Sequence, residues 1–182
     1  RTTAGAITGV TFNGVAMTNL GNVINTDGSV RIYIWGLANP TTGDVVVSGD
    51  TSLSTEVIVS IYTGVAQTGS TGTVASNKNA TTNNALTVDI TSATDELVVD
   101  MAMDEGTATA TVGASQTSRK RSPASGAGNP GNLQSSDEAG AATVTMSWTP
   151  EVTWWATIGV PLKPASDSNT AFLTFFGPQP MV

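Results

Sequence analysis

The sequence predicts an all-β protein, an antiparallel two-layer β-sandwich of about nine strands with negligible helix, in a jelly-roll or immunoglobulin-like arrangement. Residues that are β-branched or aromatic alternate with polar residues along the whole chain. No segment sustains the i, i+3, i+4, i+7 spacing of an amphipathic helix. Gly, Asn, Asp and Pro interrupt the alternation about every 8 to 12 residues, a spacing that favours a sandwich over a propeller or a solenoid.

The first predicted element is a hairpin. The segments AITGVTF (Ala6–Phe12) and VAMTNL (Val15–Leu20) are separated by Asn13-Gly14. This dipeptide is the strongest two-residue hairpin signal, because both positions tolerate a positive φ. Three strands are predicted to follow, at residues 30–37, 45–49 and 55–64, and the last of them carries Val57, Val59 and Ile61 on one face.

The second half of the chain combines predicted strands with two long polar segments. Strands are predicted at residues 85–90, 95–103, 107–113, 142–148 and 154–162, the last two joined by TPEVT as an antiparallel hairpin. Residues 65–84 and 118–139 are predicted to be exposed loops, because they are long, polar and poor in side chains that pack. The second of these loops carries Arg119, Lys120 and Arg121, where we expect trypsin to cut first.

Composition excludes several classes of function. The chain has 182 residues and contains no Cys and no His, which removes disulfides, thiolate or imidazole metal sites and every catalytic triad that needs either residue. We therefore predict no enzyme activity, no catalytic residue, no cofactor and no metal. The formal net charge of −7 disfavours nucleic acid as a partner. No apolar run is long enough to predict a membrane span.

Three pairs of adjacent carboxylates are candidate acid and base groups: Asp95-Glu96, Asp104-Glu105 and Asp137-Glu138. Neighbouring residues on a strand point to opposite faces, and all three pairs are predicted at strand ends or in turns. We therefore expect solvated turns rather than the facing carboxylates of a glycoside hydrolase. An irregular calcium site built from Asp100, Asp104 or Glu105 is retained as an alternative.

Several segments together, in their order and spacing, resemble a known type of module: VTFNGVAMTNL, IWGLANPTTGDVVV, IYTGVAQTG, DELVVDMAM, TVGASQTS, ATVTMSW and WWATIGVPLKP. They are similar to β-sandwich modules of concanavalin-like or immunoglobulin-like type, which occur in phage virion proteins and in large secreted bacterial surface proteins. The resemblance covers Ile7 to Pro164. It implies a structural or display module on a virion surface or outside the cell, and it transfers no catalytic residue. The low charged fraction of 12% agrees with such a location.

The chain departs from this pattern at both ends. Modules of this type carry one or two strands before the first hairpin, whereas only RTTAG precedes it here, and Arg1 suggests a processed or partial chain. We expect residues 1–165 to form the sandwich and residues 166–182 to form a linker and an apolar strand, AFLTFF. Both faces of that strand are apolar, which belongs in a covered position. We expect it to add to an open sheet edge, a neighbour's in preference to its own.

The aromatic residues near the C-terminus are the candidate interaction residues. Trp35 is predicted to be in the core, whereas Trp154 and Trp155 are neighbours that must face opposite ways on a regular strand. One of them should therefore face solvent, an interface or a sugar ring. The predicted interface consists of Phe172, Leu173, Phe175, Phe176, Trp154 and Trp155.

Two functions follow from the sequence. The first is a non-enzymatic structural or assembly subunit, part of a homo-oligomer or a larger assembly such as a capsid decoration, a tail or an extracellular filament. The alternative is a lectin-like adhesion module that binds a glycan through Trp154 and Trp155.

Overall fold

The computed structural model describes residues 6–26, 28, 30–50, 55–79, 85–104, 110–122, 132–149, 154–165 and 171–179, with the backbone alone for residues 122, 171 and 175–179. The described segments form antiparallel strands and no helix, which confirms the all-β prediction. Fifteen strands are described, rather than the nine expected. Several of the additional strands are short or polar, so local alternation does not predict them.

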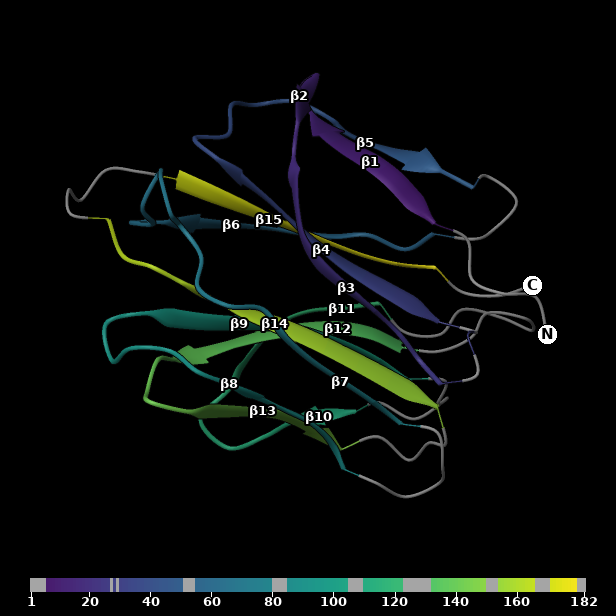
Figure 1. Ribbon diagram of the computed structural model, residues 1–182, viewed down its shortest axis with the longest axis vertical. Helices are drawn as coiled ribbons and strands as arrows, with labels where there is room; N and C mark the ends of the chain where they lie inside the picture. The colour runs from purple at the N-terminus through teal and green to yellow at the C-terminus, as the bar shows by residue number, and fades with distance from the viewer. Residues whose placement is uncertain are drawn as a thin grey trace.

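The strands form four sheets that stack as layers (Figure 1), here called sheets I to IV. Sheet I contains, in spatial order, β2 (Val15–Ala16), β1 (Ile7–Phe12) and β5 (Val45–Gly49). Sheet II contains β3 (Thr18–Ile24), β4 (Arg31–Ala38), β15 (Ala171–Gln179) and β6 (Ile58–Thr63). Sheet III contains β11 (Thr117–Ser122), β12 (Asn132–Ala139), β9 (Leu97–Asp104), β14 (Trp155–Leu162) and β7 (Ala75–Asn79). Sheet IV contains β10 (Thr111–Val112), β13 (Val144–Thr149) and β8 (Leu86–Ile90).

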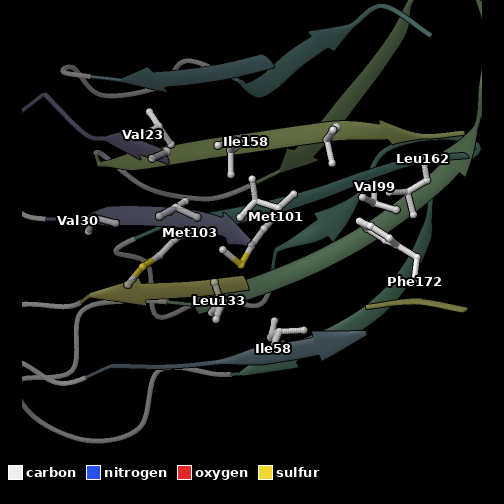
Figure 2. Close-up of a cluster of buried hydrophobic side chains, with 14 of the residues drawn as sticks. Val23, Val30, Ile58, Val99, Met101, Met103, Leu133, Ile158, Leu162 and Phe172 are labelled. Carbon is white, nitrogen blue, oxygen red and sulfur yellow. The ribbon is translucent and has the colours of Figure 1, made fainter. Parts of the chain in front are cut away.

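Sheets II and III form the central sandwich, and sheets I and IV cover its two outer faces. The main apolar cluster lies between sheets II and III and includes Ile58 and Phe172 from one side and Met101 and Leu133 from the other (Figure 2). Separate clusters join sheet I to sheet II and sheet IV to sheet III. The predicted two-layer sandwich is therefore only the centre of a four-layer stack.

Strand β4 illustrates why the central sheets are apolar on both faces. Ile32 and Ile34 belong to the cluster shared with sheet III, whereas Tyr33 and Trp35 belong to the cluster shared with sheet I. Successive side chains on a strand point to opposite faces, so the apolar residues at consecutive positions of β4 cover both of its faces. The prediction that Trp35 is a core residue is confirmed, since it is 6% exposed.

The C-terminal strand β15 is the strand between β4 and β6 in the chain's own sheet II. Phe172 packs into the cluster between sheets II and III, and Leu173 packs on the opposite side against sheet I. A covered position for this strand is thus confirmed. The expectation that it joins a neighbour's sheet is wrong for this structure, because the gap between β4 and β6 receives it within the same chain. The side chains of Phe175 and Phe176 lie outside the description.

Other sequence-based expectations need correction. The hairpin at Asn13-Gly14 is confirmed, with φ values of 49° and 76°, but its second arm divides at Met17 into β2 and β3. The two predicted loops contain strands: β7 lies in the first, and β11 pairs with β12 in the second. The predicted hairpin of β13 and β14 is also wrong, because these strands belong to sheets IV and III. Where the local pattern favoured loops, β7 and β12 pair with β14 and β9, which are distant in the sequence.

Candidate functional site

Each flank of the stack carries three sheet edges with which no described strand pairs. Only Met17 separates β2 from β3, so the β2 edge of sheet I and the β3 edge of sheet II lie on the same side. Strand β7, at one edge of sheet III, contacts β3 and lies on that side too. The opposite edges of the three sheets are β5, β6 and β11. We call this second side the open flank, because one of its edge strands, β6, exposes large apolar side chains.

Strand β6 is apolar, and no described strand pairs with its edge at the open flank. Val59 and Ile61 on β6 are 42% and 62% exposed, and Val57, directly before β6, is 40% exposed. They alternate with Ile58, which packs toward sheet III, so they point toward the level of sheet I. Sheet I covers the same face of β4 and β15 but leaves β6 uncovered. Sheet II therefore projects beyond sheet I by one strand, and its projecting strand carries an exposed apolar stripe, here defined as Val57, Val59 and Ile61.

The backbone of the stripe residues faces outward. The Thr174 hydroxyl on β15 lies 3.5 Å from the Ser60 carbonyl oxygen, to which it donates, so the polar groups of Ser60 point toward β15. In an antiparallel ladder the N–H and C=O of one residue point the same way and those of its neighbours point the opposite way. Val59 and Ile61 therefore present their N–H and C=O groups to the free edge of the sheet.

Two hollows border β6 and confirm that it lies between β5 and β11 on this flank. The first, of about 470 Å³, connects β6 to the turn that leads into β5, and it is lined by Phe12, Pro40, Thr41, Thr42, Gly43 and Ile61. The second, of about 420 Å³, connects β6 to β11 below it, and it is lined by Ser60, Ile61, Tyr62, Thr63 and Arg119.

Strand β11 gives the lower part of the open flank a positive charge. The half-exposed Arg119 guanidinium donates to both oxygens of the buried Asp137 carboxylate on β12, one of them at 2.9 Å. Lys120 is exposed and lies opposite Ser135, on the same face of sheet III as the core residue Leu133. Both cations thus face the level of sheet II. Burial, followed by the Asp137 carboxylate, raises the pKa of the Tyr62 phenol, which stays a neutral hydroxyl at this site.

The buried carboxylates serve the fold and are closed to a substrate. Asp100 is fully buried and accepts hydrogen bonds from the Ser136 N–H (3.0 Å), the Ser136 hydroxyl (2.6 Å) and the Trp148 indole N–H (2.8 Å). Burial raises the pKa of Asp100 to about 7, although these donors oppose the shift. Asp104 is equally buried and accepts from Asn132 and Gln134 at 3.1 and 2.9 Å. These groups tie strands β9, β12 and β13 together.

The three acidic pairs therefore differ from the expectation. Asp95 is exposed and Glu96 accepts from the Ala93 N–H in a turn, as predicted. Asp104 and Asp137 are buried instead of solvated, because β9 and β12 lie inside sheet III and are covered on both faces. Within the part of the chain that the structure describes, no group of three or more acidic side chains is placed to hold a metal ion. Glu105 lies outside that part.

The four predicted interface residues whose side chains the structure describes, Trp154, Trp155, Phe172 and Leu173, do not form one surface. Trp155 is 2% exposed in the cluster between sheets III and IV, whereas the adjacent Trp154 is partly exposed. Phe172 and Leu173 are buried in the chain's own core. The exposed stripe on β6 was not selected from the sequence, although its alternation was recognised. Whether an alternating strand is central or lies at an edge depends on topology, which the alternation does not encode.

No protein-family model, no curated protein and no solved structure matches this chain. Among the described residues there is no helix of the length and apolarity needed to cross a membrane. The function is therefore argued from the geometry of the open flank.

Proposed function

We propose that this chain is a non-enzymatic structural or assembly protein, a β-sandwich subunit that joins its neighbours by strand addition at β6. The observation that carries the proposal is the contrast between two free edges on the same flank. Edge strands are commonly protected from pairing by charged side chains, above all Lys. Strand β11 has this protection in Arg119, Lys120 and Arg121, whereas β6 presents Val59 and Ile61 at an edge with which no described strand pairs.

Strand addition at β6 is favourable for two physical reasons. It removes the exposed stripe from water, and burying an apolar side chain completely stabilises by about 1.5 to 3 kcal/mol, so each half-exposed residue contributes about 1 kcal/mol. It also pairs the outward N–H and C=O groups of Val59 and Ile61 with a second strand, as in other cases of β-augmentation. Together these terms favour a specific contact of modest strength.

The setting that we propose is a virion surface, as a capsid decoration or tail component, or an extracellular filament. The low charged fraction of 12% supports an extracellular or virion location, as does the resemblance to modules of phage virion and secreted surface proteins. Glycan binding is the weaker candidate. Stacking on a sugar ring needs an exposed aromatic face, and of the two tryptophans Trp155 is buried and Trp154 is only partly exposed.

The experiment is a measurement of mass by light scattering over a range of protein concentrations. We expect the wild-type chain to associate and the Ile61→Lys variant to remain monomeric, because a buried lysine opposes docking of the stripe. Val15→Lys is the matched control, since Val15 is 52% exposed on β2 at the opposite flank. A wild-type chain that stays monomeric at every concentration contradicts the proposal. Equal association of wild type and Ile61→Lys contradicts it as well.

A further inference from the structure

We infer that the occupant of the open flank is a second copy of this chain, inverted so that β6 of each copy pairs with β5 of the other. The inference rests on the proposed function and names its partner and geometry. In this arrangement the two copies are related by a twofold axis that runs parallel to the strands, midway between the levels of sheets I and II. Sheet I of one copy then lies level with sheet II of its partner.

The stepped shape of the flank fits this arrangement. Sheet II projects one strand beyond sheet I, so β6 projects where β5 is set back. After the twofold rotation, the projecting β6 of one copy fills the step beside β5 of the partner, and the reverse contact forms simultaneously. The two stripes then lie one above the other on the axis, where Val57, Val59 and Ile61 face the same residues of the partner. An isologous contact of this kind closes as a dimer.

The strand directions permit hydrogen-bonded pairing. Strands β4 and β6 are both antiparallel to β15, so they run parallel to each other. Strand β5 follows β4 after residues 39–44 and returns in the next sheet, so it runs opposite to β4 and β6. Rotation about an axis parallel to the strands preserves direction. The partner's β5 is therefore antiparallel to β6, and the outward groups of Val59 and Ile61 meet a strand edge that is also free.

Charge complementarity selects this orientation. Strand β5 lies between two exposed acids, Asp44 and Asp50. Val45 and Val47 pack toward sheet II, so by alternation Asp44 belongs to the outer face of sheet I. In the inverted dimer the outer face of sheet I of one copy is opposite β11 of the partner, whose Arg119 and Lys120 point toward that face. The alternative twofold, perpendicular to the sheets, places β11 against β11 and brings like charges together.

The acid and the cations also lie at the same end of the strands. Asp44 directly follows the turn of residues 40–43, which shares a hollow with Ile61. Arg119 shares the other hollow with Tyr62 and Thr63, the last residues of β6. A rotation about an axis parallel to the strands does not exchange the two ends of the stack. Asp44 of one copy is therefore placed near Arg119 and Lys120 of the other.

The contact has the size of a weak dimer. Only the levels of sheets I and II overlap in this arrangement, so two layers spaced about 10 Å apart and strands of about six residues at ~3.3 Å each give a contact of about 20 by 20 Å. Each copy then buries about 400 Å², in the range of weak, transient contacts. The net charge of −7 on each copy opposes association, so the local pairs between β5 and β11 are needed.

The test exchanges the charges of the two strands. Lys120→Glu and Asp44→Lys should each weaken dimerisation about tenfold, because each dimer loses two ion pairs. An equimolar mixture of the two variants should regain the wild-type affinity, since in the mixed dimer Asp44 meets Lys120 at one contact and the two introduced charges meet at the other. Arg119 is left unchanged because it neutralises the buried Asp137. Lys78→Glu, on the exposed face of β7 at the opposite flank, is the control and should dimerise as the wild type does.

The outcomes separate the inference from the proposed function. Restoration in the mixture, with a light-scattering mass of two chains, supports the inverted dimer. Association that depends on Ile61 but is insensitive to Asp44 and Lys120 refutes the inverted dimer and leaves assembly through β6 intact. A third outcome is that Lys120→Glu associates with wild type more strongly than either protein associates with itself. This result indicates the perpendicular twofold and refutes the inverted dimer. A monomeric wild-type chain overturns both.

Discussion

Replacing Asp100 with Asn should change how stability depends on pH. The Asp100 carboxyl is fully buried between sheets III and IV and accepts from Ser136 and Trp148. Burial raises its pKa from 3.8 to about 7. The folded chain therefore keeps a proton that the unfolded chain releases between these two values. Its stabilising contribution is complete below pH 4 and is lost as the pH rises through about 7.

The size of the effect follows from the shift in pKa. The difference between about 7 and 3.8 is about three units. At about 1.36 kcal/mol per unit, the wild-type chain loses about 4 kcal/mol of stability from this group between pH 4 and pH 8. Asn cannot ionise and has no such loss. It does place an amide N–H against the Trp148 indole N–H, but that cost is the same at every pH and cancels when the two conditions are compared.

The assay is denaturant unfolding of both proteins at pH 4 and pH 8. The free energy of unfolding of Asp100→Asn relative to wild type should increase by about 4 kcal/mol at the higher pH. The same substitution at the exposed Asp95 controls for the loss of one negative charge. A relative free energy that is constant with pH would refute the reasoning, because Asp100 would then have the same proton affinity in the folded and unfolded chain.

Three further predictions concern the core and the strands that the sequence did not reveal. Phe172→Ala should lower the free energy of unfolding, measured by urea denaturation, by about 3 to 5 kcal/mol, because Phe172 is 2% exposed. The control Val46→Ala, at a position 54% exposed, should change it little. A loss below about 1 kcal/mol for Phe172→Ala would contradict the assigned position of β15. Removal of residues 171–182 should prevent folding, because β15 provides the only described strand partner of β6, and cooperative thermal unfolding of the truncated chain would contradict this. Trypsin should leave the bonds after Arg119, Lys120 and Arg121 intact in the native protein, because β11 pairs with β12, and early cleavage there would mean that the pairing does not persist.

Local sequence pattern predicted the elements whose identity depends on near neighbours. The Asn13-Gly14 turn is specified by two residues that tolerate a positive φ, and both adopt it. The alternation of β6 correctly placed Val57, Val59 and Ile61 on one face. Sheet membership was not predictable in this way, because β15 pairs with residues far away in the chain. The exposure of the stripe on β6 depends on that pairing and on the width of sheet I.

Polar strands account for most of the errors in the secondary structure predicted from the sequence. Strand β12 has the sequence NLQSSDEA, yet its first six residues are buried. Its side chains pair with specific distant groups, such as Ser136 with Asp100 and Asp137 with Arg119. Each partner satisfies a polar group that would otherwise favour a solvated loop. Composition cannot anticipate these partners, because they come from β9 and β11 and meet only after the sheet has formed.

Amide hydrogen exchange at Val59 and Ile61 tests assembly through β6 most directly. Their N–H groups point to the free edge, whereas the Ser60 N–H points toward β15 and serves as an internal reference. The account predicts rapid exchange at Val59 and Ile61 in dilute protein, and exchange that slows as the concentration and the share of associated chains increase. Exchange at these two amides that stays rapid while light scattering reports association would contradict the account, because the chains would then be joined at another surface.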